Sequence, residues 1–147
     1  MQRRSAGSSG AQRLAAIPLF EGVSPGELNM LGRILDVVVA EPGEVLMAEG
    51  GQGFEVMMIE EGSAEVLQRG ERINVMEPGD FFGEIAVLSD GAPRTATVVA
   101  LTPLQGLVFT AHFARTMHDR LPRVGERMQQ AVRERRERDA GAGTPRD

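Results

Sequence analysis

The sequence contains no cysteine, no tryptophan and no tyrosine, and it has no long run of apolar residues. Without cysteine the chain forms neither a disulfide framework nor a thiolate metal site, which fits a reducing cytoplasm. No apolar run approaches the roughly 20 residues that a helix needs to cross a bilayer, and the N-terminus lacks the apolar core of a signal peptide. These absences predict a cytoplasmic protein without membrane insertion.

Positive charge is also scarce, because the formal net charge is -5 at pH 7. Duplex nucleic acid is bound mainly through clustered Lys and Arg that meet phosphates. We therefore expect no direct contact with nucleic acid. A small anionic ligand needs only a local positive pocket and stays compatible with this charge.

The length and composition are those of one globular domain. The chain has 147 residues, of which 41% are hydrophobic and 25% charged, close to the averages for folded proteins. Its first residues are rich in Ser, Gly and Arg, and its last ones contain Gly and Pro. The sequence predicts a flexible tail over residues 1–13, a folded domain over residues 14–138 and a disordered tail over residues 139–147.

The centre of the chain has a β pattern, with short apolar runs separated by Gly-rich turns about every eight to twelve residues. No helix long enough for a crossover separates these runs, which argues against a parallel α/β sheet. The fold class we expect is mainly β with flanking helices (α+β), built as an antiparallel β-roll or jelly-roll barrel. The predicted strands are residues 37–39, 45–47, 54–59, 64–67, 73–76, 95–101 and 106–109.

Helices are predicted on both sides of this β region. Ser24 and Glu27 form a capping box around Pro25, which predicts a short helix over residues 25–35. Towards the C-terminus the pattern predicts two helices, one over residues 111–121 and one from Pro122 to about Arg138.

One segment, residues 82–100, interrupts the strand pattern with FGEIAVLSDGAPRTATVVA. Gly83 permits a close backbone approach, one helical turn follows, and a loop then brings Arg94 to the start of a strand. Backbone N–H groups and a guanidinium aimed at one point suit phosphate oxygens. Glu84 would accept a hydrogen bond from a hydroxyl such as that of a ribose, and Ala96 is small enough for a ligand to lie against. The alternative is that Glu84 and Arg94 only form a salt bridge across the loop.

These residues resemble the phosphate-binding cassette of cyclic nucleotide-binding domains, which occur in cAMP-dependent kinase regulatory subunits, catabolite-activator-type regulators and cyclic nucleotide-gated channels. The resemblance implies that Glu84 binds the ribose 2′-hydroxyl and that Arg94 pairs with the cyclic phosphate. It implies cAMP as the ligand, with cGMP as the alternative because Thr95 leaves the base open, and no cofactor. The ligand-binding residues it implies are Phe82, Gly83, Glu84, Ile85, Ala86, Pro93, Arg94, Thr95 and Ala96.

The resemblance also implies that a C-terminal helix moves over the base as a lid. Val124, Arg127 and Met128 of the second C-terminal helix are the candidates for this role. Members of the family that use an aromatic cap differ here, because the chain has no Trp or Tyr. The alternative for the apolar stripe of Val124, Met128 and Val132 is packing on the barrel or on a partner helix.

Three other functions compete with this interpretation. A metal enzyme with a related β architecture needs several converging His or carboxylate ligands, whereas the chain has only His112 and His118. A DNA-binding regulator needs a helix-turn-helix after the lid helix. A domain that has lost its ligand would act only through protein contacts. We therefore expect a non-catalytic cyclic nucleotide sensor, whose downstream protein partner or fused effector the sequence does not identify.

Overall fold

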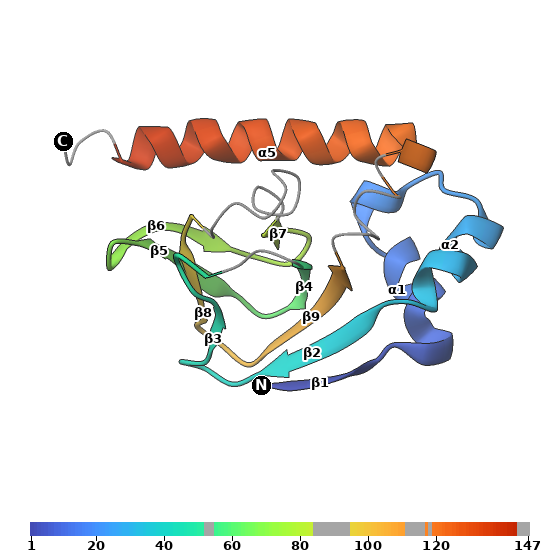
Figure 1. Ribbon diagram of the computed structural model, residues 1–147, viewed down its shortest axis with the longest axis horizontal. Helices are drawn as coiled ribbons and strands as arrows, with labels where there is room; N and C mark the ends of the chain where they lie inside the picture. Colours follow the sequence, from blue (N-terminus) through green and yellow to red (C-terminus); the bar gives the residue numbers. More distant parts are fainter. Residues whose placement is uncertain (52–54, 84–94, 111–116, 118, 144–147) are drawn as a thin grey trace.

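The computed structural model describes residues 1–51, 55–83, 95–110, 117 and 119–143 (Figure 1). The strands are β1 (Gln2–Ser5), β2 (Asp36–Ala40), β3 (Val45–Met47), β4 (Glu55–Glu61), β5 (Ala64–Gln68), β6 (Glu71–Met76), β7 (Phe81–Phe82), β8 (Thr97–Ala100) and β9 (Leu104–Thr110). The helices are η1 (Gly7–Ser9), α1 (Gly10–Ala15), η2 (Pro18–Phe20), α2 (Pro25–Gly32) and α5 (Pro122–Gly143). Each predicted strand has a counterpart here, whereas β1 and β7 were not predicted.

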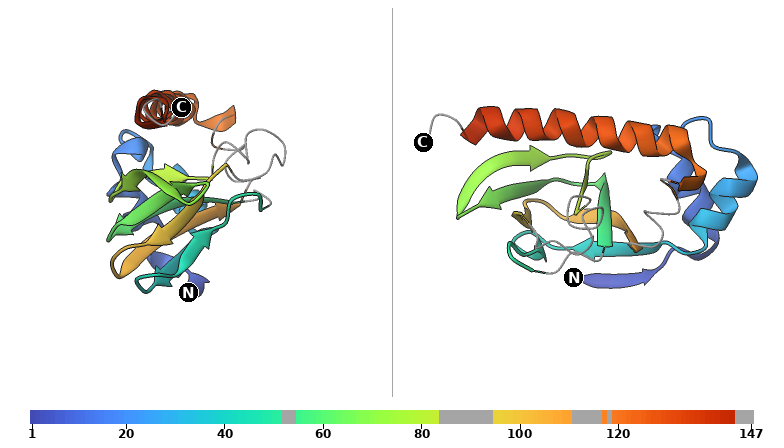
Figure 2. Two further views of the ribbon diagram at one scale, coloured as in Figure 1. Left: turned by 90° about the vertical axis from the view of Figure 1, so that its left-hand side faces the viewer. Right: turned by 45° about the horizontal axis from the view of Figure 1, so that its top comes forward.

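The strands form two antiparallel sheets that make a roll rather than a closed barrel. One sheet has five strands in the order β1-β2-β9-β4-β7, and the other has four in the order β3-β8-β5-β6. The strand pairings within both sheets are antiparallel. The short helices gather at one end of the roll, while α5 runs along it (Figure 2). The predicted fold class is confirmed.

The five-stranded sheet carries apolar side chains on both of its faces, because successive residues of a strand point to opposite sides. In β4, for example, Val56 and Met58 face one way while Met57 and Ile59 face the other. The sheet therefore separates two hydrophobic clusters. This double burial explains why β4 reads as an almost continuous apolar run.

The inner cluster fills the space between the two sheets and draws residues from both. Its members are Val38, Ala40, Met57, Ile59, Ala64, Val66, Met76, Phe82, Ala96, Val98, Ala100, Leu104 and Val108. The helical cluster lies on the other face of the five-stranded sheet, under the helices. Its members are Ala6, Leu14, Ile17, Phe20, Leu31, Leu35, Val37, Val56, Met58, Phe81, Leu107, Phe109, Met117, Val124 and Met128.

Helix α2 begins as its sequence predicts. Ser24 is the N-cap, and its Oγ accepts a hydrogen bond from the Glu27 backbone N at 3.3 Å. The Glu27 side chain reaches back to the Ser24 hydroxyl at 3.0 Å. The helix ends at Gly32, three residues before the predicted end at residue 35. Gly32 lies against α1, where a Cβ on it would lie 2.3 Å from the Ala11 backbone N.

The N-terminus differs from the predicted flexible tail. Residues Gln2–Ser5 form β1, which pairs with β2 along its whole length. Arg3 binds Asp36 through its Nε at 2.6 Å and Glu55 through both terminal nitrogens. The hydrogen bond to Glu55 is the largest influence that raises the pKa of Arg3 above its usual value. The strand was missed because all four of its side chains are exposed and polar, so it has no apolar alternation to detect.

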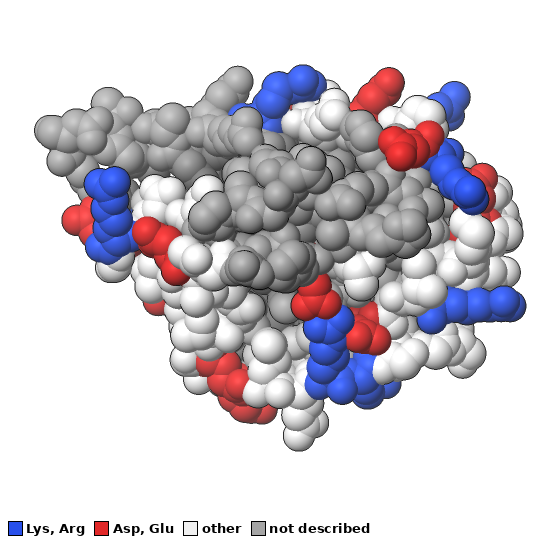
Figure 3. All heavy atoms as spheres, in the orientation of Figure 1, with Lys and Arg blue, Asp and Glu red and all other residues white. Residues whose placement is uncertain are grey.

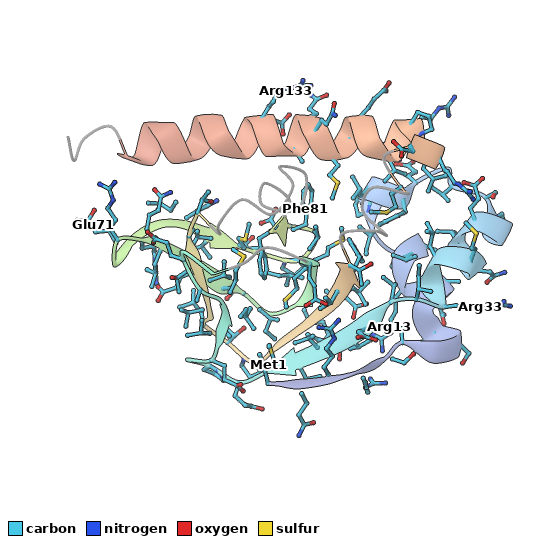
Figure 4. All side chains as sticks on the ribbon, in the orientation of Figure 1. Met1, Arg13, Arg33, Glu71, Phe81 and Arg133 are labelled. Atoms are coloured by element: carbon cyan, nitrogen blue, oxygen red, sulfur yellow. The ribbon has the colours of Figure 1, made fainter. Side chains whose placement is uncertain are left out.

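Helix α5 begins at Pro122 as predicted but continues to Gly143, beyond the predicted end near Arg138 and into the predicted disordered tail. Arg133 lies on its outer side, away from the sheets (Figure 4). Within the described part of the chain, no helix is both long and apolar enough to span a membrane.

Candidate functional site

The two described ends of the predicted ligand-binding segment come from different sheets. Phe82 belongs to β7, which pairs with β4 in the five-stranded sheet. Ala96 directly precedes β8 of the four-stranded sheet. Both are buried in the inner cluster, at 4% and 6% exposure. The chain therefore leaves one sheet and returns through the other around a shared apolar core.

Five of the predicted ligand contacts lie outside the described residues. These are Glu84, Ile85, Ala86, Pro93 and Arg94. His112 and His118 of the metal-enzyme alternative also lie outside them. The roles of Glu84 and Arg94 in binding ribose and phosphate therefore stay predictions.

Gly83 has the backbone conformation that requires glycine. Its φ is +94°, a region that residues with a Cβ avoid. It follows a strand of only two residues, in which Met57 of β4 is the partner of Phe82. The sequence analysis expected Gly83 to allow a close backbone approach, and this positive φ explains why a larger residue would be strained here.

Thr95 and Thr97 are held by a set of hydrogen bonds that we call the polar corner, formed by Glu49, Gln68, Arg69, Thr95 and Thr97. The Gln68 Nε2 donates to the Thr95 carbonyl at 3.1 Å, and the Glu49 backbone N donates to Thr97 Oγ1 at 3.0 Å. The Arg69 backbone N donates to Glu49 Oε1 at 3.0 Å. The corner thus ties the β5–β6 turn and the chain after β3 to the start of β8. Thr95 itself is exposed, so its side chain is accessible to a ligand.

A small hollow of about 40 Å³ opens beside Phe82. It is lined by Leu46, Met47, Glu55, Met57, Phe82 and Val108. Glu55 is the charged residue of this lining, and Arg3 of β1 forms an ion pair with it at 2.5 Å. The carboxylate at this hollow is therefore neutralised from the N-terminal strand, which reduces its repulsion of an anionic ligand.

The candidate lid residues contact the helical end of the molecule. Val124 and Met128 are 1% and 3% exposed and belong to the helical cluster. The Arg127 Nη1 donates to the carbonyl oxygens of Leu19 at 3.0 Å and Glu21 at 2.7 Å. In this conformation the three residues anchor α5 to η2 and the chain after it. A lid role stays a prediction that requires α5 to release these contacts.

A larger hollow, of about 430 Å³, lies at the same helical end, between the chain that precedes α2 and the start of α5. It is lined by Val23, Leu121, Pro122 and Val124 among apolar residues and by Glu21, Glu27, Arg120 and Arg123 among charged ones. Its charges are mixed, and none of the described cassette residues (Phe82, Gly83, Thr95 and Ala96) lines it. Size alone therefore does not identify the ligand site in this fold.

The visible surface carries acidic and basic side chains side by side. On the face shown in Figure 3 they are interspersed among neutral residues, without one continuous basic surface in the described part of the chain. The described residues of this face therefore show no clustered basic charge of the kind that binds nucleic acid.

Two features of the site were missed by sequence reasoning. Strand β7 has only two residues, too few for a period-2 pattern, although the adjacent pair Phe81 and Phe82 was a signal for a strand buried on both faces. The pairing of Arg127 with two main-chain carbonyls had no sequence signal, because it joins positions more than 100 residues apart.

The two-sheet antiparallel roll with helices at one end is a β-roll domain. The cyclic nucleotide-binding domain family matches residues 37–120, which include the whole predicted cassette. The chain belongs to this family.

Relatives of known identity place the domain within larger proteins. The acetyltransferase Pat of Mycolicibacterium smegmatis is 40% identical over 130 residues, which cover 85% of this chain and 38% of that protein. A cAMP-dependent protein kinase regulatory subunit of Yarrowia lipolytica is 38% identical over 94 residues, covering 63% of this chain and 25% of that protein. The solved structure of a cAMP-binding acyltransferase from Mycobacterium smegmatis, a point mutant, is 40% identical, with a TM-score of 0.63 over 73% of this chain and 34% of that one. The chain thus spans well under half of the length of each.

Proposed function

We propose that the chain is a regulatory module that binds cAMP in the segment from Phe82 to Thr97 and is not itself catalytic. Glu84 holds the ribose 2′-hydroxyl, and Arg94 holds the cyclic phosphate beside the backbone of Gly83 and Thr95. The observation that carries the proposal is the FGEIA and PRTAT pair of motifs within the family match at residues 37–120. cGMP is the alternative ligand.

The described residues support this assignment in two ways. Gly83 has the positive φ that such a cassette turn needs. Phe82 and Ala96 are packed in one cluster, which brings the two ends of the segment to one core. The names of a kinase subunit and an acyltransferase relative favour cAMP over cGMP.

The test is isothermal titration with cAMP, cGMP and 5′-AMP in parallel. We expect cAMP to bind more tightly than cGMP, and 5′-AMP to bind weakly because it lacks the cyclised phosphodiester. Arg94→Ala should weaken cAMP binding by about 2 to 5 kcal/mol, the range for removing one member of a buried charge pair. Arg33→Ala, an exposed arginine after α2, is the matched control.

Absence of heat at high micromolar cAMP and cGMP would contradict the proposal and favour a domain that acts only through protein contacts. Equal binding of Arg94→Ala and the parent chain would contradict the role of Arg94 while leaving ligand binding in place.

The output of the module is a change in the position of α5. A ligand shifts such an equilibrium only by its differential affinity for the two positions. We therefore expect cAMP to increase the amide-exchange protection of residues 122–138. Identical protection with and without cAMP would refute the switch but not the binding. Any effector chemistry, such as acyl transfer, would then be carried out by another protein segment whose activity depends on the position of α5.

A further inference from the structure

A row of residues crosses the inner face of the four-stranded sheet. The register pairs Met47 of β3 with Val98 of β8, Val98 with Val66 of β5, and Val66 with Asn74 of β6. Residues that stand opposite one another in an antiparallel ladder project from the same face. Val98 and Val66 are buried in the inner cluster at 0% and 6% exposure. The Asn74 side chain therefore projects from the inner face, as the one polar member of an apolar row.

The oxygen of the Asn74 amide has a hydrogen-bond partner, whereas its nitrogen has none among the residues that the structure describes. Its Oδ1 accepts a hydrogen bond from the Val75 backbone N at 2.8 Å, which fixes the orientation of the amide. Its Nδ2 is buried, and it is the buried side-chain polar atom without a hydrogen-bond partner in the described part of the chain. Leaving such a donor buried and unpaired costs about 1 to 3 kcal/mol, so its presence calls for a partner such as a ligand or a bound water.

Phe82 and Ala96, which flank the predicted ligand contacts, belong to the same inner cluster as the neighbours of Asn74. In the proposed function, Glu84 and Arg94 already hold the ribose and the phosphate. The part of the nucleotide left to recognise is the base, which has apolar faces and hydrogen-bond acceptors in its rings. Because Nδ2 is buried in the ligand-free protein, a base reaches it only after it displaces the atoms that cover it. An apolar surface with a fixed donor is then the kind of environment that binds and orients such a group.

We propose that Asn74 donates a hydrogen bond from Nδ2 to an acceptor atom of the nucleobase. The inference rests on the proposed function and adds a base-reading residue to the same site. Because only the N–H₂ half of the amide is available, Asn74 pairs with a ring nitrogen or a carbonyl oxygen of the base. It does not pair with an exocyclic amine.

The first test compares cAMP titrations of the parent chain, Asn74→Leu and Asn74→Ala. Loss of one hydrogen bond should weaken binding by up to about tenfold. The melting temperature of the nucleotide-free Asn74→Leu protein should change little, because the substitution removes a buried unpaired donor but also the acceptor of the Val75 backbone N. A residue that only packs would lose affinity and stability together, so weaker binding without a lower melting temperature is specific to ligand recognition.

The second test removes the acceptor from the ligand, using 1-deaza-, 3-deaza- and 7-deaza-cAMP. One analogue should bind the parent chain up to about tenfold more weakly than cAMP yet bind Asn74→Leu as tightly as cAMP does. That analogue identifies the ring nitrogen. The matched control is Asn29→Leu, an exposed asparagine on α2, which should behave like the parent chain with all four ligands.

Equal cAMP affinity of Asn74→Leu and the parent chain would overturn the proposal and assign the donor to water. The proposal would also be overturned if each analogue lost affinity by the same factor for Asn74→Leu as for the parent chain. Failure of the proposed function has a different signature, since the parent chain itself would then give no heat with cAMP, and the assignment of Asn74 would fall with it.

Discussion

The two hydrophobic clusters of this domain have different predicted tasks. The inner cluster contains Phe82 and Ala96 of the proposed ligand-binding segment, while the helical cluster contains the candidate lid residues Val124 and Met128. The five-stranded sheet lies between the two clusters. In the proposed function, a displacement caused by the nucleotide can reach the lid residues through this sheet, although α5 also contacts β6 of the other sheet.

Strand β7 is the shortest element that touches both clusters. Phe81 is buried in the helical cluster and Phe82 in the inner cluster, because adjacent residues of the strand point to opposite faces of the sheet. Phe81 lies below α5 in Figure 4. Among the described strands, β7 is at the edge of its sheet and pairs with β4 through two residue pairs. Because β7 places one ring in each cluster, we expect it to pass a displacement from one cluster to the other.

The largest expected effects come from Phe81→Ala and Phe82→Ala. Each removes a buried ring and should lower the free energy of unfolding by about 3 to 5 kcal/mol, measured by urea denaturation. The two clusters are then separated with Phe81→Leu and Phe82→Leu, which better preserve volume. Phe82→Leu should weaken cAMP binding, and Phe81→Leu should mainly change amide exchange in α5. If both variants changed both readouts equally, the two clusters would act as one unit.

A smaller effect, confined to the helical cluster, is expected from Gly32→Ala. A Cβ on Gly32 would lie 2.3 Å from the Ala11 backbone N, so α1 and α2 must separate. Such overpacking typically costs about 1 to 3 kcal/mol, measured by urea denaturation, while cAMP affinity should stay the same. Gly26→Ala is the control on the same helix, because a Cβ there meets nothing within 4 Å, and it should be neutral or stabilising.

A loss of cAMP affinity in Gly32→Ala that matched its loss of stability would show that the helical cluster also shapes the ligand site. That result would show that the two clusters do not have separate roles.

Most of the fold was predictable because its signals are local. The Ser24 and Glu27 capping box set the start of α2, and Gly-rich turns set the strand limits. What could not be predicted depends on distant partners. The exposed strand β1 is held by β2 and by the ion pairs of Arg3 with Asp36 and Glu55. No residue pattern within the strand predicts these contacts.

In the candidate site, too, local motifs were predictable and contacts between distant residues were not. The cassette residues were predicted from a contiguous motif, and Gly83 of that motif has a positive φ. The inward position of Asn74 depends on the register of β6 against β5, and the anchoring role of Arg127 depends on η2 at the other end of the chain. Neither register nor long-range contact is fixed by composition or spacing.

Arg127→Ala tests the anchor of α5. It removes two charge-assisted hydrogen bonds to main-chain carbonyls on a partly exposed surface, so the free energy of unfolding should fall by about 1 to 2 kcal/mol. Amide exchange in the first turns of α5 should become faster. Arg123→Ala, an exposed arginine on the same helix, should change neither quantity. If Arg127 instead capped the base, its loss would weaken cAMP binding and leave the exchange of nucleotide-free α5 unchanged.

The smallest expected effect comes from the polar corner. Gln68→Ala removes the bond to the Thr95 carbonyl, which is exposed and therefore worth only about 0.5 to 1 kcal/mol. Because Thr95 begins the return from the proposed ligand-binding segment, the loss should weaken cAMP affinity by about two- to fivefold. The free energy of unfolding should fall by no more than the value of this bond. Titration and urea denaturation measure the two effects, with Gln12→Ala on α1 as the control. An unfolding free energy that fell while affinity held would make the corner part of the roll's framework rather than of its ligand site.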